Sequence, residues 1–311
     1  MSLFAAQYDY WVAPLGTVGL LFLGSLATWL VLYALCSFFL PRVTSIARAT
    51  VYEAVTTPVA LVLVGVGTFL ILIFPYIPAN TFGQDVKELK GNGLVLLMLL
   101  GVGLGIWTSS KALSKELEGR TALLVLAKPI SRLQFMLGKY LGVLALVALL
   151  FVILGNLFLV TVSYEVAYDA RESVTFHTDG AQKCREAVAT TIPGVILAFL
   201  EAAVLSSIAI ALSTRLSALP NLVICITLYL LGHLTPTLVA QGQGAYGLVA
   251  WMAKLLATIV PVLDHFNITT AIMSDNPVPW SYVGQATCYA VLYCALAMVL
   301  GLLMFEDREV A

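Results

Sequence analysis

Charged side chains are scarce in this sequence. Asp, Glu, Lys and Arg make up 11% of its 311 residues, whereas hydrophobic residues make up 60%. A soluble domain carries about 25% charged residues, because its surface needs polar groups in contact with water. The composition therefore excludes an ordinary soluble protein and indicates that the chain folds in a lipid bilayer. The net charge of −1 provides no global field that would attract nucleic acid.

Motifs for metals, cofactors and nucleotides are also absent. The five cysteines form no Cys-x-x-Cys pair, and His177, His233 and His265 have no partner at metal-ligand spacing. The Gly-x-x-x-x-Gly-Lys-[Ser/Thr] pattern of a phosphate-binding loop does not occur. We therefore expect no bound metal or cofactor, no catalysis and no ATP hydrolysis by this chain.

Two pairs of glycines are spaced four residues apart within apolar stretches. Gly101 and Gly105 lie inside an apolar run with no strand before it, so close helix packing explains them better than a dinucleotide-binding loop. Gly138 and Gly142 have the same spacing and are interpreted in the same way. Both pairs predict places where two helices approach closely.

Seven apolar runs are each long enough to cross a bilayer as a helix. About 20 consecutive apolar residues span the hydrocarbon core. The runs predict an all-α, polytopic integral membrane protein with about seven transmembrane helices. They are Leu15–Phe39, Val59–Ile77, Gly93–Ser110, Tyr140–Val162, Ile192–Ser213, Leu219–Val239 and Tyr282–Met304.

Lysine and arginine residues between the spans predict the orientation of the chain. The connection at residues 111–139 contains six of them, so the positive-inside rule places it in the cytoplasm. Alternation of the spans then puts the N-terminus outside and the C-terminus in the cytoplasm, in the plasma membrane. The acidic stretch Tyr164–Thr191 becomes an external loop.

One further stretch, Tyr246–Leu263, is apolar and nearly long enough to span. Lys254 lies near its middle, and a central lysine costs about 2.5–3.5 kcal/mol on membrane-insertion scales. We therefore predict an external re-entrant region over residues 240–281, because irregular backbone is tolerated at depth where protein or water covers it. A full crossing is the alternative, and it would place the C-terminus outside.

The segment before the second span predicts a helix that lies along the inner membrane surface. Apolar residues recur on one face of residues 43–57, whereas Arg48 and Glu53 fall elsewhere. Thr44 could cap the start of this helix, and Pro58 allows the next one to begin. The apolar face consists of Val43, Ala47, Val51, Ala54 and Val55.

The most charged interruption of the apolar pattern is Ser114–Arg132, SKELEGRTALLVLAKPISR. As a helix over Lys111–Ala127 it carries an apolar stripe, and Glu116 and Arg120 pair one turn apart on another face. The stripe consists of Leu113, Leu117, Thr121 and Leu124. Pro129 ends this helix, and a second short helical segment leads into the next span. These residues leave two interpretations open: a solvated loop whose charges only fix the topology, and a surface that docks on a partner.

The longer stretch KELEGRTALLVLAKPISRLQFMLGKYLG resembles the cytoplasmic connection of ABC type 2 permeases, the membrane-spanning subunits of ABC transporters. The shared pattern is an acidic residue, Gly-x-Thr, a Leu-rich turn, Pro-x-Ser-Arg and Gly-Lys. ALSTRLSALPNLVICITLYLLGH resembles the family's short inner turn, and VPVLDHFNITTAI resembles part of its external stretch. The resemblance covers residues 42–311 and leaves residues 1–41 as an extra N-terminal span. It identifies the family and not the substrate.

The resemblance implies a role for the segment 111–139. In such permeases this connection is a coupling helix that docks on a separate ATP-binding subunit and passes ATP-driven movement to the spans. The partner then binds the ATP, and the permease forms a homodimer, or a heterodimer with a related permease. We expect export of a substrate. The docking residues implied in this chain are Glu116, Leu117, Glu118, Gly119, Thr121, Lys128, Pro129 and Arg132.

Two polar residues inside the spans are further candidates. Glu201 lies near the middle of the fifth span, and intramembrane carboxylates usually face a bundle interior or a water path. It either lines a translocation pathway or a dimer seam, or it is a hydrogen-bonded packing residue. His233, near the outer part of the sixth span, has the same two interpretations, and packing is preferred.

Two other function classes stay open as alternatives. A self-sufficient channel or secondary carrier would be favoured by inverted repeats with paired broken helices, and we find no convincing repeat. A membrane-embedded enzyme would need polar residues clustered at one depth, which the sequence does not indicate.

Overall fold

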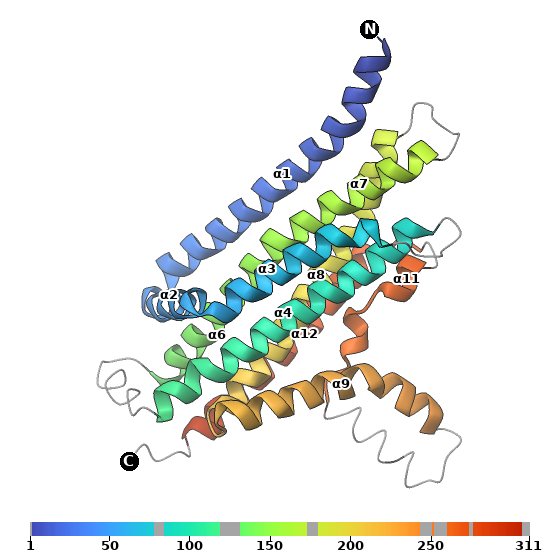
Figure 1. The fold of residues 1–311 in the computed structure, drawn as a ribbon. Coiled ribbons are helices and arrows are strands. Elements are labelled where there is room, and N and C mark those ends of the chain that lie inside the picture. The colour runs from blue at the N-terminus through green and yellow to red at the C-terminus, as the bar shows by residue number, and fades with distance from the viewer. Residues whose placement is uncertain are drawn as a thin grey trace.

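Helices account for the regular secondary structure in residues 2–77, 84–118, 131–172, 180–242, 251, 260–273 and 276–306, which are the residues that the computed structural model describes. Seven helical segments in these ranges are long and apolar enough to cross a bilayer. Most of them run side by side in one bundle (Figure 1). The prediction of an all-α, polytopic membrane protein with seven spans is confirmed.

The spans follow one another along the chain with short helices between them. The segment α6–η2–α7 forms one continuous span, in which η2 is a single π-helical turn. The start of α1 and the end of α12 lie at opposite ends of the bundle (Figure 1). The elements are α1 (Ser2–Phe39), α2 (Pro41–Thr56), α3 (Pro58–Ile73), η1 (Phe74–Tyr76), α4 (Asp85–Glu118), α6 (Arg132–Leu150), η2 (Phe151–Gly155), α7 (Asn156–Glu172), α8 (Gly180–Ser213), α9 (Ala218–Gly242), η3 (Leu263–Phe266), α11 (Thr269–Met273) and α12 (Trp280–Glu306).

The helix predicted before the second span exists as α2, which lies across the direction of the spans (Figure 1). Its predicted cap is wrong. The helix begins at Pro41, because proline is favoured at the first helical position, where its missing N–H costs nothing. Thr44 therefore falls inside the helix, where its hydroxyl donates to the carbonyl of Leu40 at 3.0 Å. Pro58 starts α3, as predicted.

The face of α2 that is buried differs slightly from the predicted one. Val43, Ala47 and Ala54 are buried as expected, whereas Val55 is exposed and Thr50 is buried in its place. Thr50 can face the interior because its hydroxyl donates to the carbonyl of Ile46, which satisfies the polar group within the helix.

Glycines of α6 make the contact with α2 possible. A Cβ atom added to Gly138 would lie 3.0 Å from the carbonyl oxygen of Val43, and one added to Gly142 would lie 2.8 Å from that of Ala47. Backbone atoms cannot move aside, so only glycine lets the two helices approach this closely. The packing predicted from the four-residue spacing is confirmed here.

The central helix of the bundle is α8, which packs against α4, α6, α7, α9 and α12. The other glycine pair brings α4 against it and against η2. A Cβ atom on Gly105 would collide with the hydroxyl of Ser206, and one on Gly101 would lie 2.5 Å from the ring of Phe151. The second prediction of close packing is therefore confirmed as well.

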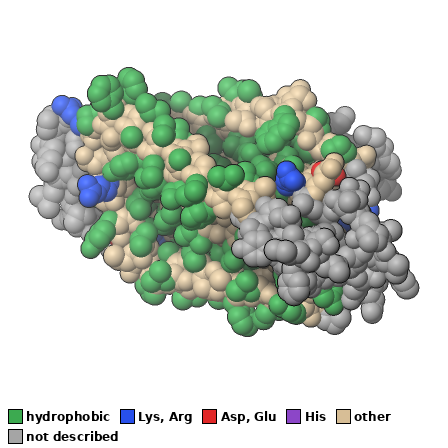
Figure 2. Space-filling view, turned by 90° about the horizontal axis from the view of Figure 1, so that it is seen from above, with side chains coloured by type: hydrophobic (Ala, Val, Ile, Leu, Met, Phe, Trp, Pro, Cys, Tyr) green, Lys and Arg blue, Asp and Glu red, His purple; other side chains and the backbone are tan. Residues whose placement is uncertain are grey.

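Helices at the periphery expose large hydrophobic side chains, as expected where lipid is the solvent. These side chains extend to the rim of the molecule in Figure 2. The first span, α1, is among the most exposed: Leu20 is 71% exposed and Leu23 is 61% exposed. Polar contacts also attach α1 to the bundle: the indole of Trp29 donates to the carbonyl of Ala145 at 3.3 Å, and the amide of Asn156 donates to the hydroxyl of Ser25 at 3.2 Å.

One predicted connection turns out differently, and a second cannot be compared. The stretch Tyr164–Thr191, expected as a loop, is largely helical, because α7 continues to Glu172 and α8 begins at Gly180. Both helices therefore extend beyond their most apolar segments. Most of Tyr246–Leu263 lies outside the described residues, so its re-entrant course stays a prediction.

Candidate functional site

The charged connection predicted to dock on a partner lies between α4 and α6. The helix predicted from Lys111 is confirmed as far as Glu118, and it is a direct continuation of the third span rather than a separate element. The side chains of residues 113–118 and all of residues 119–130 lie outside the described residues. Among the predicted docking residues, the side chain of Arg132 can be placed.

The far end of this connection is fixed by a helix cap. The hydroxyl of Ser131 accepts a hydrogen bond from the backbone N–H of Gln134 at 3.2 Å, and the side chain of Gln134 accepts one from the backbone N–H of Ser131 at 3.2 Å. This reciprocal pair satisfies two donors that a helix start otherwise leaves unpaired. The new helix predicted after Pro129 therefore begins at a defined point, Arg132.

Arg132 contacts the end of α12. Its guanidinium donates to the carbonyl of Phe305 at 3.2 Å and lies 5.5 Å from the centre of the Phe305 ring. The Phe305 ring in turn stacks on Phe135 with 6.5 Å between ring centres. Arg215, in the turn between α8 and α9, donates to the neighbouring carbonyl of Met304 at 2.7 Å.

The two arginines satisfy carbonyl groups that a helix leaves unpaired in its last turn, where the helix dipole also favours positive charge. They tie the end of α12 to the start of α6 and to the α8–α9 turn. The sequence analysis assigned Arg132 to a partner surface and missed this contact within the chain. The sequence signal was available, because Arg132 opens a helix and Arg215 occupies a short turn at the same predicted side of the membrane.

A buried polar pair joins α8 to α9. Oε1 of Glu201 lies 2.8 Å from Nε2 of His233, with the Glu201 side chain 0% exposed and the His233 side chain 20% exposed. The other carboxylate oxygen of Glu201 is buried and has no hydrogen-bond partner among the described residues. The ring of Tyr229 packs edge-on against the ring of His233, with 4.9 Å between centres.

The segment before η3 covers α9 at the level of this pair. A Cβ atom on Gly232, next to His233, would lie 2.9 Å from the carbonyl oxygen of Pro261 and 2.6 Å from the side chain of Leu263. The absence of a side chain at Gly232 therefore lets the segment before η3 pack directly on α9.

Sequence analysis named Glu201 and His233 separately and did not pair them. A signal was present, because α8 ends at Ser213 and α9 begins at Ala218. Two helices joined by so short a turn run antiparallel, so residues at similar distances from the turn lie at similar depth. Whether the pair lines a pathway or a dimer seam stays a prediction. In this conformation Glu201 is fully covered by the chain itself.

Comparison with known proteins adds one finding. Residues 77–310 match the model of a family described as ABC-2 family transporter protein. The match covers well over half of the chain and leaves out α1, α2 and α3. The predicted domain boundary at residue 42 stays a prediction. No curated protein matches the chain.

Proposed function

This chain belongs to the ABC-2 family of transporter proteins and is a membrane-spanning permease component of an ABC transporter; on that premise we propose that it exports its substrate with ATP hydrolysed by a separate subunit. The observation that carries the proposal is the charged connection 111–139 between two well-packed helices. We propose that this connection docks on the ATPase subunit and that two permease chains form a dimer.

The contacts at the ends of the connection suggest how movement would pass into the membrane. Both α4 and α6 pack against α8, so a displacement of the connection would shift two neighbours of the central helix. Through Arg132 and Phe305 the start of α6 also carries the end of α12 with it. Through Gly138 and Gly142 it carries α2. The helices α2, α4, α6 and α12 would therefore all move in response to docking at this one connection.

A self-sufficient channel or carrier is the alternative, and an ATPase assay separates the two functions. Purified alone, the chain should hydrolyse no ATP above background. Together with the ABC ATPase subunit that co-purifies with it, it should support ATP-driven transport in vesicles, and a Walker-motif variant of that subunit should abolish it. Transport by the isolated chain without ATP would contradict the proposal.

The proposed orientation, with the N-terminus outside and the C-terminus in the cytoplasm, has its own test. Ser2→Cys should react with a membrane-impermeant maleimide in intact cells, whereas Ala311→Cys should react only after the membrane is opened. The unmodified chain provides the background from its five native cysteines. External labelling at position 311 would instead mean that Tyr246–Leu263 crosses the membrane.

A further inference from the structure

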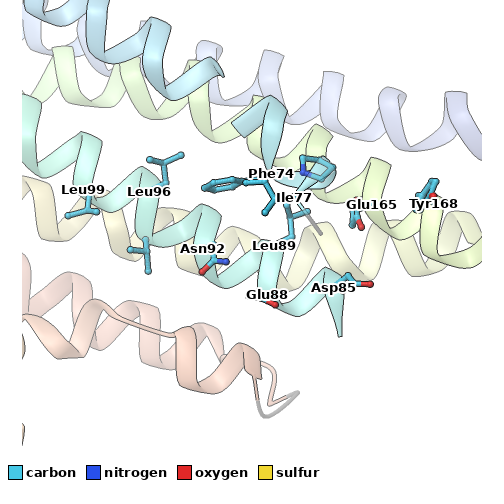
Figure 3. Close-up of a pocket in the computed structure, with 12 residues that line it drawn as sticks. Phe74, Ile77, Asp85, Glu88, Leu89, Asn92, Leu96, Leu99, Glu165 and Tyr168 are labelled. Carbon is cyan, nitrogen blue, oxygen red and sulfur yellow. The ribbon is translucent and has the colours of Figure 1, made fainter. Parts of the chain in front are cut away.

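A cavity of about 640 Å³ lies between η1, α4 and α7, at the end of the bundle where α4 begins (Figure 3). Its volume falls in the range of about 300–1,000 Å³ that is typical of small-molecule sites. Twelve residues line it, and neither the ATPase-docking proposal nor the Glu201–His233 pair involves any of them.

One face of α4 forms a long wall of this cavity. Asp85, Glu88, Asn92, Leu96 and Leu99 follow one another at spacings of three and four residues, which places them on one side of the helix. At 1.5 Å per residue this wall is about 21 Å long. This wall is acidic at the start of α4 and becomes apolar toward the middle of the helix, as Figure 3 shows.

A third carboxylate enters from a different helix. Glu165, on α7, lines the cavity and is 8% exposed. Asp85 and Glu88 lie in the first turn of α4, where the helix dipole favours negative charge. The fold therefore gathers three acidic side chains at one end of the cavity, and no Lys or Arg is among the lining residues.

The charge of the cavity fits an organic cation better than a metal ion. The described part of the chain contains no group of three or more His, Cys, Asp or Glu residues arranged to hold a metal. An extended cavity with a separate apolar wall instead suits a molecule that has both a positive group and an apolar body. Phe74 and Ile77 add apolar surface opposite α4.

The cavity is also open along the side of α4. Val95 is 37% exposed and Leu99 is 48% exposed, and both lie within a membrane-spanning helix. An amphiphile could therefore enter from the lipid with its apolar part along Val95 and Leu99. Its charged group would then lie at the end of the span, close to the three carboxylates.

We propose that this cavity binds an amphiphile with a cationic head group and an apolar tail. That this amphiphile is the transported substrate rests on the proposed function, whereas binding itself does not. The head group would lie between Glu88 and Glu165, and the tail would lie along Leu96 and Leu99.

A photoreactive dodecyl-ammonium probe tests the site on the purified full-length chain in phosphatidylcholine nanodiscs. Mass spectrometry should find the label on peptides from α4 and α7. Unlabelled dodecyltrimethylammonium should compete with the probe, whereas dodecyl sulfate of the same tail length should not. Equal competition by both, or label spread evenly over the spans, would overturn the proposal.

Matched variants test the carboxylates. Glu165→Gln and Glu88→Gln each keep the shape of the side chain and remove its charge, and each should weaken competition by dodecyltrimethylammonium about tenfold, which is about 1.4 kcal/mol. Glu186→Gln is the control, because Glu186 is an exposed residue of α8 outside the cavity that contacts Gln182. An equal loss in the control, or no loss in either cavity variant with unchanged melting temperatures, would contradict the site.

The outcome is separable from the test of the proposed function. Probe binding needs no ATPase subunit, so a chain that co-purifies with its ATPase but fails to bind the probe overturns the site alone. Specific binding with no ATP-driven movement of dodecyltrimethylammonium in vesicles would overturn the assignment of this amphiphile class as substrate.

Discussion

The Glu116→Lys, Glu118→Lys double variant is expected to reach the membrane in normal amounts and to lose both the ATPase subunit and transport. Both residues lie in the part of α4 that continues past its candidate membrane span, which ends at Ala112. We expect both side chains to lie on the surface, where substitutions usually alter the free energy of unfolding by no more than about 0.5 kcal/mol. Breaking a desolvated charge pair at an interface can cost about 2–5 kcal/mol of binding free energy. The double variant should therefore weaken binding of the ATPase subunit far more than it lowers the stability of the fold.

A pull-down of the ATPase from detergent extracts, beside a measurement of membrane levels, decides this prediction. Leu117→Asp should give the same loss through the apolar stripe. Glu186→Lys serves as the matched control, because it reverses an exposed charge on α8 at the opposite end of the bundle and should leave the partner bound. If the double variant and Leu117→Asp both keep the partner and transport, the connection only fixes the topology of the chain.

The second large effect is expected from His233→Ala, which should lower the free energy of unfolding by about 3–5 kcal/mol. Glu201 is fully buried, and His233 is the side chain that contacts its carboxylate at 2.8 Å. Removal of His233 leaves a buried carboxylate without this partner, and its second oxygen already has none among the described residues. Denaturant unfolding in detergent micelles measures the change.

Two comparisons make this result specific. His265→Ala should cost much less, because His265 is exposed and its ring only packs edge-on against Tyr289 at 5.9 Å. The Glu201→Leu, His233→Leu double variant should be less destabilised than His233→Ala, since apolar residues can replace a buried pair at little cost. A double variant as unstable as the sum of its single variants would show that the two residues do not act as a pair.

Transport by Glu201→Gln then separates a pathway role from a packing role. This variant keeps a hydrogen-bonding group opposite His233 and removes the possibility of a negative charge. If Glu201 faces the pathway in another conformation, transport should change while the ATPase stays bound. Unchanged transport with altered thermal stability would assign Glu201 to packing.

Local patterns in the sequence were enough to predict the elements and some of their contacts. Run length predicted the seven spans, because the thickness of the bilayer fixes the number of apolar residues that a helix needs. Spacing of four residues predicted that Gly138 and Gly142 would admit another helix, because it places both glycines on the same face of α6, where no side chain then projects from either position. The start of α6 after Pro129 was predicted because proline disfavours helix at the residue before it.

Contacts between distant side chains were harder to predict. Arg132 and Phe305 are 173 residues apart, and only the folded bundle places the end of α12 beside the start of α6. The polar cavity had no sequence signal either, because Glu165 and Glu88 belong to helices that meet only after packing. The cap predicted at Thr44 was wrong for a local reason. Threonine is a common N-cap residue, but Pro41, three residues earlier, starts the helix.

The length of α4 has a mechanical consequence. Its 34 residues extend about 51 Å, whereas the hydrocarbon core of a bilayer is about 30 Å thick. The helix therefore extends beyond the hydrocarbon core: one end leads into the connection 119–130, and the other end carries Asp85 and Glu88. A tilt of about 5° applied at the first end displaces the second by about 4 Å over this length. A change at the ATPase would then reach the rim of the cavity through one continuous helix.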